Sequence, residues 1–150
     1  MLRFPARTQS PQTLAETAPK KRMKINIQEI ENVSKLNPFE RYKYFIKKLA
    51  DLEIFYTLKD ENNNYVISEL ENHQLFPIWN FKEFAELCLI EEWKNFKIKE
   101  LSLDDLQDEI IDLVSNENYL LNVFPIGLKT GFVVDLEEFI SDLKEESDKY

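Results

Sequence analysis

The period of the hydrophobic positions changes several times along the chain, and each change predicts a new element. The clearest case is the stretch Leu75 to Leu89, where an apolar run passes directly into an amphipathic pattern. Residues 75–79 are apolar or aromatic, and Pro77 cannot donate to a β-ladder, so they predict an edge strand or a strand end. Asn80 and Glu83 have the spacing of a capping box, so a helix is predicted to begin directly after the strand.

Three more helices are predicted from caps and periodicity. Asn37 followed by Pro38 indicates a helix over residues 38–51, because Asn favours the cap and Pro the first helical position. Its apolar stripe is Phe39, Tyr42, Phe45, Ile46 and Leu49, and its basic residues, Arg41 included, are predicted to lie outside. Ser102 with Asp105 predicts a helix to about residue 115, and Asp135 begins a terminal helix. A short helix is also expected between residues 25 and 33.

The remaining apolar runs predict strands. Residues 54–58 and 65–70 are rich in β-favouring side chains and flank an Asn-rich turn, which predicts a hairpin. Residues 119–124 and 131–134 predict a second hairpin, and residues 97–101 a further strand. The order predicts an α+β domain with a mixed or largely antiparallel sheet of about five to six strands, with helices packed mainly on one face. Strict βαβ alternation is absent, which argues against a doubly wound nucleotide-binding fold.

The first 22 residues differ in composition from the rest. They hold five basic residues, one acid and three prolines, and Met23 follows them. We therefore predict a disordered or upstream-derived tail at 1–22 and a single domain at 23–150, a usual domain length. The whole chain carries a net charge of −9, and removing five bases and one acid leaves −13 on residues 23–150. The expected folded part is strongly acidic, which argues against direct binding of nucleic acid.

Several short motifs occur in a fixed order: NPFERYKYFIKKLAD at 37–51, LFPIW at 75–79 with FAE at 84–86, Trp93, VFPI at 123–126 and a final Leu-Glu-Glu helix. Together they resemble the bacterial family of domain of unknown function 2750, over about residues 33–143. That family favours a Trp in the first strand and a Gly-Trp after the hairpin turn. This chain has Phe55 or Tyr56 and then Asn64-Tyr65 at those places. The resemblance implies no activity, because the family is uncharacterised.

Few residues of the chain suggest catalysis. Cys88 and His73 are the only Cys and His, and Cys88 falls on the predicted buried face of its helix, where a thiol is inert. His73 has no thiolate beside it and is expected in a solvated turn, so no metal site is predicted. Two glycines match no phosphate-binding loop, and no cofactor is expected. We predict that the protein is not an enzyme. A lone Cys and the lack of a signal or membrane-spanning segment predict a cytoplasmic location.

Acidic residues concentrate towards the C-terminus, where residues 100–150 hold fourteen acids and three lysines, a net of −11. One group falls on the polar side of the predicted helix from residue 102: Asp104, Asp105, Asp108, Glu109 and Asp112. This pattern is typical of a solvated helix face, and it also suits capture of a cationic surface. The sequence therefore predicts an acidic protein-binding module, such as an immunity or inhibitor protein that neutralises a basic bacterial toxin. It leaves the oligomeric state open.

The aromatic content supports an alternative function. Four residues could line a concave site, with a guanidinium as anchor: Arg41, Tyr56, Trp79 and Trp93. On this hypothesis the protein is a small-ligand-binding or regulatory domain with an aromatic pocket. The same aromatic side chains would equally serve as core.

Overall fold

The computed structural model describes residues 25–149, so the predicted tail at 1–22 lies outside the described residues. The α-helices are α2 (Ile27–Ser34), α3 (Pro38–Leu52), α4 (Lys82–Glu86), α5 (Leu103–Asp105), α6 (Ile111–Glu117) and α7 (Leu136–Ser147), with a 3-10 turn η1 (Glu91–Trp93) and a π-helical turn η2 (Leu106–Ile110). The strands are β1 (Ile54–Lys59), β2 (Ser68–Leu70), β3 (His73–Ile78), β4 (Lys97–Ser102), β5 (Leu120–Val123) and β6 (Phe132–Val134).

The described strands form two ladders that are joined at one point. β1 pairs with β4, and the other four strands lie in the order β2-β3-β5-β6, with only the β3–β5 pair parallel. Tyr56 and Trp79 connect the ladders by mutual backbone hydrogen bonds of 2.7 and 2.9 Å. The predicted α+β fold with mixed, largely antiparallel strands is confirmed. The parallel pair is possible because a long crossover carrying α4, β4 and the helix from residue 103 separates β3 from β5.

The first predicted hairpin forms only near its turn. Tyr65 bridges Lys59, and the amide of Val66 donates to Leu58 O at 3.0 Å, but β2 then leaves β1 and pairs with β3. The predicted hairpin of residues 54–58 and 65–70 is therefore formed only next to the turn, and its second strand pairs with β3 instead. The reason is that Trp79 occupies the edge of β1 at Tyr56 that the second strand would have used. The second predicted hairpin, between β5 and β6, is confirmed.

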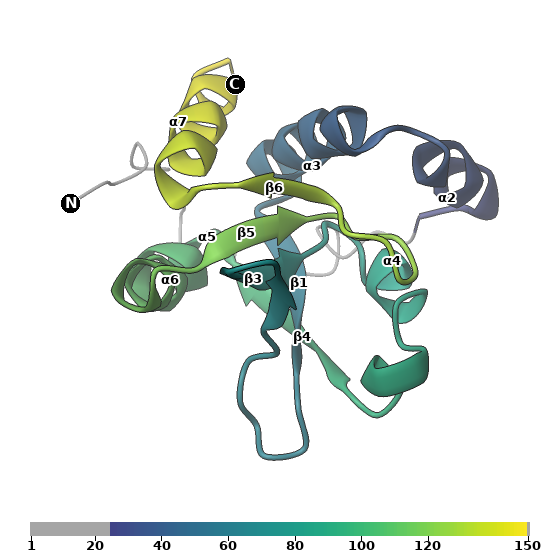
Figure 1. Cartoon of the computed structure of the whole chain (residues 1–150). Helices are drawn as coiled ribbons and strands as arrows, with labels where there is room; N and C mark the ends of the chain where they lie inside the picture. Colours follow the sequence, from purple (N-terminus) through teal and green to yellow (C-terminus); the bar gives the residue numbers. More distant parts are fainter. Residues whose placement is uncertain (1–24, 150) are drawn as a thin grey trace, which may run out of the picture.

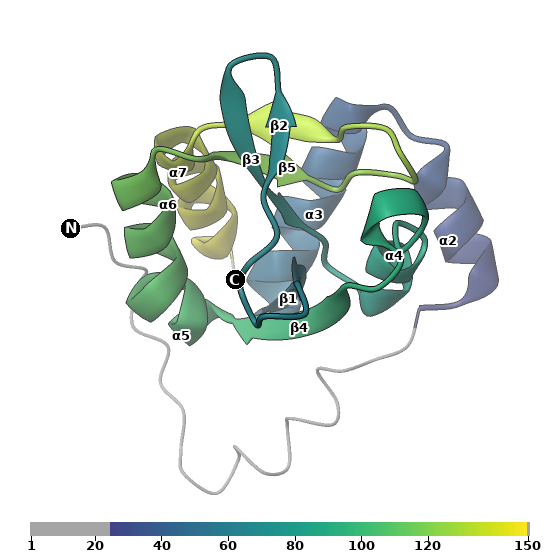
Figure 2. The ribbon, with the colours of Figure 1, turned by 60° about the horizontal axis from the view of Figure 1, so that its bottom comes forward.

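The core lies between the helices and the sheets. α3 packs against α7, β5 and β6, and α4 packs against β1 and β4 (Figure 1). The largest side chains with essentially no exposure are Trp79, Phe45, Phe55, Phe76, Phe84, Phe124 and Phe139. Burial of such side chains stabilises by roughly 1.5–3 kcal/mol each, which makes this aromatic cluster the main support of the fold. The tip of the β2–β3 hairpin projects away from it (Figure 2).

Most predicted helix caps are confirmed by hydrogen bonds. The Oδ1 atoms of Asn37 and Asp135 accept from the amides of Glu40 and Glu138, each at 2.8 Å. Ser102 and Asp105 form a reciprocal capping box, with N–O distances of 2.9 and 3.1 Å. These caps satisfy amides that the first helical turn leaves without partners, so each one fixes where its helix begins.

Asn80 is the exception, and its predicted capping box with Glu83 is wrong. α4 begins at Lys82 with Phe81 at the cap position, and Asn80 is only 2% exposed. Neither Oδ1 nor Nδ2 of Asn80 has a hydrogen-bond partner among the described residues. Asn80 follows Trp79, which is fixed to β1, and precedes the buried Phe81, so this segment is drawn inward and the amide lies in the interior.

We expect Asn80→Leu to stabilise the protein by about 1 kcal/mol. A buried polar group without a partner costs about 1–3 kcal/mol, and the apolar side chain of similar length avoids that cost at the risk of slight overpacking. Chemical denaturation of both proteins measures the difference. A loss of stability of more than about 1 kcal/mol, the size of a typical hydrogen bond, would contradict this account of the Asn80 amide.

α3 departs from its predicted pattern at two positions. Phe39 was predicted to be buried but is 50% exposed, with its ring against Phe132 at a centroid distance of 5.4 Å. Arg41 was predicted to lie outside but is 6% exposed, because it precedes Phe45 by one helical turn and so shares the buried face. Its Nε donates to Phe124 O at 3.2 Å and its Nη1 donates to Leu36 O. Burial lowers the pKa of this guanidinium below its usual value.

Candidate functional site

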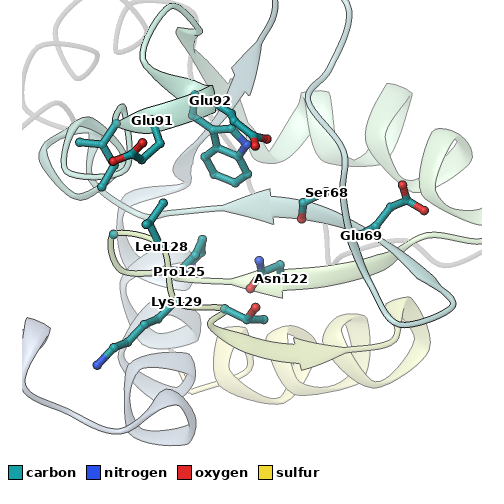
Figure 3. Close-up of a pocket in the computed structure, with 12 residues that line it drawn as sticks. Ser68, Glu69, Glu91, Glu92, Asn122, Pro125, Leu128 and Lys129 are labelled. Carbon is teal, nitrogen blue, oxygen red and sulfur yellow. The ribbon is translucent and has the colours of Figure 1, made fainter.

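A cavity of about 450 Å³ lies between η1 and the loop that connects β5 to β6 (Figure 3). It is lined by Ser68, Glu69, Ile90, Glu91, Glu92, Trp93, Asn122, Pro125, Gly127, Leu128, Lys129 and Thr130. Its volume falls within the range of roughly 300–1,000 Å³ that is usual for ligand sites. The lining combines apolar side chains with a few polar groups, which is also typical of such sites.

Asn122 is the most deeply buried polar residue of this lining. It is 3% exposed, and its Oδ1 accepts a hydrogen bond from the amide of Gly131 at 2.8 Å. That bond fixes which end of the amide is the oxygen, so Nδ2 is a donor of known orientation. Nδ2 has no hydrogen-bond partner among residues 25–149. Asn122 lies within the ring of lining residues (Figure 3) and offers this donor to the cavity.

The loop on one side of the cavity is held by the core. Pro125 O accepts from Trp79 Nε1 at 2.9 Å and from Cys88 Sγ at 3.3 Å. Ile126 and Lys129 exchange backbone hydrogen bonds of 3.1 and 2.8 Å across the turn. Because these contacts fix the start of the loop and its turn, this wall of the cavity is formed before any ligand binds.

Charges around the cavity are mostly negative. Glu91 and Glu92 lie on the η1 side, and Glu69 lies beside Ser68 at the other end (Figure 3). Lys129 is the one basic residue of the lining, and its amino group points away from the cavity (Figure 3). An anionic ligand would therefore meet the carboxylates of Glu91 and Glu92 without an opposing cation, so the electrostatics favour a cationic or neutral ligand.

Of the four residues of the predicted aromatic pocket, one lines the cavity at η1. Trp93 lines the cavity described above. Arg41, Tyr56 and Trp79 are buried parts of the fold: Arg41 binds backbone carbonyls, Tyr56 pairs with Trp79, and Trp79 binds Pro125. The pocket residues that the sequence did not indicate come from β2, the η1 segment, β5 and the β5–β6 loop. One signal for them was available, because Asn122 interrupts the apolar run of residues 120–124.

The predicted acidic face lies on the continuous helix formed by α5, η2 and α6. Asp104, Asp108 and Asp112 are exposed and make no ion pair among residues 25–149. Asp105 belongs to the capping box, and Glu109 accepts a hydrogen bond from the Tyr65 hydroxyl at 2.8 Å. The structure therefore brings all five carboxylates together on one helix, two of them with structural roles.

Cys88 lies in the core, as predicted, and its thiol contacts the β5–β6 loop at Pro125. It is buried, and burial raises the pKa of its thiol to about 11. At neutral pH the thiolate fraction is therefore very small, and the thiol is a poor nucleophile. His73 is exposed at the start of β3 and is not adjacent in sequence to Cys88 or to the acidic residues of the helix. Within residues 25–149, no three His, Cys, Asp or Glu side chains gather as a metal site requires.

A second hollow lies between α3 and α7, where Tyr42 donates to Asp142 Oδ2 at 2.6 Å. Burial raises the pKa of Tyr42, and the hydrogen bond and the charge of Asp142 raise it further. The phenol therefore stays protonated and acts as a donor to the carboxylate, which fastens α3 to α7. This pair is not poised for proton abstraction by the phenol.

Comparison with known proteins gives a family without an assigned activity. The family model described as "Protein of unknown function (DUF2750)" matches residues 42–143, which include both hairpins, the cavity lining and the acidic helix. A search of curated proteins found no match. None of the helices within residues 25–149 has the length and apolar character needed to cross a membrane.

Proposed function

The chain belongs to the DUF2750 family, whose model matches more than half of it, and we propose that it is a non-catalytic module that captures a basic protein. An immunity or inhibitor protein that neutralises a bacterial toxin in the cytoplasm would act in this way. The inert setting of Cys88 and the protonated state of Tyr42 support a role in binding rather than in catalysis.

One observation carries this proposal: Asp104, Asp108 and Asp112 are exposed on one helix without a pairing cation among the described residues. When carboxylates are not neutralised within the protein, their electrostatic field can act on an incoming partner. Such fields accelerate the encounter of oppositely charged proteins by about 10- to 1,000-fold. The spacing of four residues places the three side chains along one side of the helix, so a single basic surface can contact all of them.

The helix that carries these acids is also fixed in place. The capping box of Ser102 and Asp105 sets its start, and Glu109 is bound by Tyr65 from the β1–β2 connection. Leu106 and Ile110 bury its other side in the core. A charged surface on a rigid element loses little conformational freedom on binding, which favours affinity.

Affinity capture from the native host tests the proposal. We expect the immobilised protein to retain a basic protein that elutes in high salt. The variant Asp104→Lys/Asp108→Lys/Asp112→Lys should retain at least about tenfold less, because it replaces attraction by repulsion. Glu31→Lys/Asp51→Lys/Glu61→Lys is the matched control, since these three residues are exposed and lie elsewhere. The proposal is wrong if no basic protein elutes, or if the two variants retain it equally.

The cavity favours a second candidate, a small-ligand-binding domain. Its support is the combination of Trp93 with the oriented amide of Asn122 in one preformed cavity. This places the proposed ligand between η1 and the β5–β6 loop instead of beside Arg41, Tyr56 and Trp79. A thermal-shift screen of metabolites tests it, and the absence of any stabilising compound would count against it.

A further inference from the structure

The two walls of the cavity at η1 differ in the chemistry they present. Glu91 and Glu92 lie on one side, and Asn122, Pro125 and Leu128 lie on the other (Figure 3). A ligand that spans the cavity from η1 to β5 therefore meets the carboxylates of Glu91 and Glu92 on one side and, apart from Lys129, whose amino group points away, uncharged side chains on the other. This asymmetry indicates a ligand with a cationic end.

The neutral wall contains one donor that lacks a partner among the described residues. Oδ1 of Asn122 already accepts from the amide of Gly131, and Nδ2 is the group of this side chain that has no partner within residues 25–149 and can donate to a ligand. Nδ2 is not fully buried, so it is accessible from the cavity, and a ligand acceptor can take the place of water on it. A carboxylate or phosphate is disfavoured as this acceptor by the carboxylates of Glu91 and Glu92, which leaves a neutral oxygen such as a carbonyl.

Apolar surface connects the two ends. Trp93 and Pro125 line the cavity, and Ile90 and Leu128 line it while remaining unusually exposed for their type. Exposed apolar side chains that border a concave site mark a surface for apolar parts of a ligand. An aliphatic stem would fit on this apolar surface between the carboxylates and the amide.

We propose that this cavity receives a basic residue, lysine or arginine, from a protein partner. Its ammonium or guanidinium group binds Glu91 and Glu92, its aliphatic stem packs on Trp93 and Leu128, and a backbone carbonyl accepts from Asn122 Nδ2. The chemistry of this site is independent of the acidic helix. The source of the basic residue rests on the proposed function, because a free amine could offer the same charge.

Nuclear magnetic resonance titrations with small probes test the site directly. Nα-acetyl-lysine methylamide should shift the side-chain amide signals of Asn122 and the indole N–H signal of Trp93 in a saturable way. Nα-acetyl-norleucine methylamide has the same stem and carbonyls without the charge, and it should bind about three- to tenfold more weakly. Hexylamine represents a free amine without a carbonyl, and it should leave the Asn122 signals unchanged.

Variants that remove the negative charge from the η1 side of the cavity complement the titrations with these probes. Glu91→Gln/Glu92→Gln should weaken the lysine probe by about three- to tenfold and leave the norleucine probe unaffected. Glu61→Gln/Glu117→Gln removes the same charge from exposed positions outside the cavity and should change neither probe. These surface substitutions are not expected to disturb folding.

Each outcome bears on the proposal. The assignment is overturned if the lysine probe causes no saturable shift, or if lysine and norleucine probes bind equally. An equal response of Asn122 to hexylamine overturns the carbonyl contact and indicates a free amine. If the lysine probe fails while a basic protein is still captured through the acidic helix, only this inference is lost. If the probe binds while no basic protein is captured, the cavity assignment survives and the proposed function does not.

Discussion

Arg41→Met is expected to reduce the free energy of unfolding by about 2–3 kcal/mol. Arg41 is buried, and its guanidinium donates to the carbonyls of Leu36 and Phe124. Hydrogen bonds from charged groups contribute about 1.5–3 kcal/mol each, and the variant leaves two carbonyls without these donors. Removal of a buried charge recovers part of that loss, because burial of the ion is itself unfavourable.

Urea denaturation measures this effect, with Lys47→Met as the control. Lys47 lies on the same helix and is exposed, so its replacement should change stability by no more than about 0.5 kcal/mol. Arg41→Met should also shift the signals of the β5–β6 loop, because Phe124 lies at its start with a positive φ of 66°. Equal stabilities of the two variants would show that the contacts of Arg41 do not support the fold.

Gly131→Ala is expected to destabilise the protein by about 3 kcal/mol. A Cβ at this position would lie 2.1 Å from Val123 O and 2.7 Å from the carbonyl carbon of Phe124. Both are backbone atoms of the paired hairpin, so they can move apart only if the hairpin opens. Overpacking against a fixed neighbour costs typically about 1–3 kcal/mol, and the shift would also break the bond from Gly131 to Asn122.

Gly127→Ala is the comparison variant, because it tests the cost of an unfavourable backbone conformation without a steric clash. Gly127 has a φ of 57°, but nothing lies within 4 Å of the position that an added methyl group would take, so the loss should be only about 1–2 kcal/mol. Thermal and chemical denaturation compare the two variants. In Gly131→Ala the Asn122 signals should no longer respond to the lysine probe, whereas in Gly127→Ala they should still respond. A loss at Gly131 no larger than that at Gly127 would contradict the close approach.

Local signals in the sequence predicted most of the elements. The caps at Asn37, Ser102 and Asp135 were predictable because a cap depends on residues within one helical turn. Asn80 carries the same local signal, but the pairing of Trp79 with β1 overrides it. The charge of Arg41 predicts an exposed position, but its spacing of one turn from Phe45 places it on the buried face of α3.

The cavity could not be predicted in the same way. Its lining comes from β2, η1, β5 and the β5–β6 loop, and β2 reaches β5 only through the parallel pairing of β3 with β5. Trp93 was recognised as a candidate from its side chain alone. The role of Asn122 depends on the amide of Gly131, nine residues away across a hairpin, and no periodic pattern encodes that contact.

The ionic-strength dependence of association tests the central claim most directly. The partner recovered by affinity capture would be mixed with the protein, and the association rate constant measured from low salt to about 0.3 M, where the Debye length falls well below about 10 Å. Electrostatic capture predicts a fall of about tenfold or more over this range, and Asp104→Lys/Asp108→Lys/Asp112→Lys should abolish most of that dependence. An association rate constant that is the same at low and high salt would contradict capture by the acidic helix.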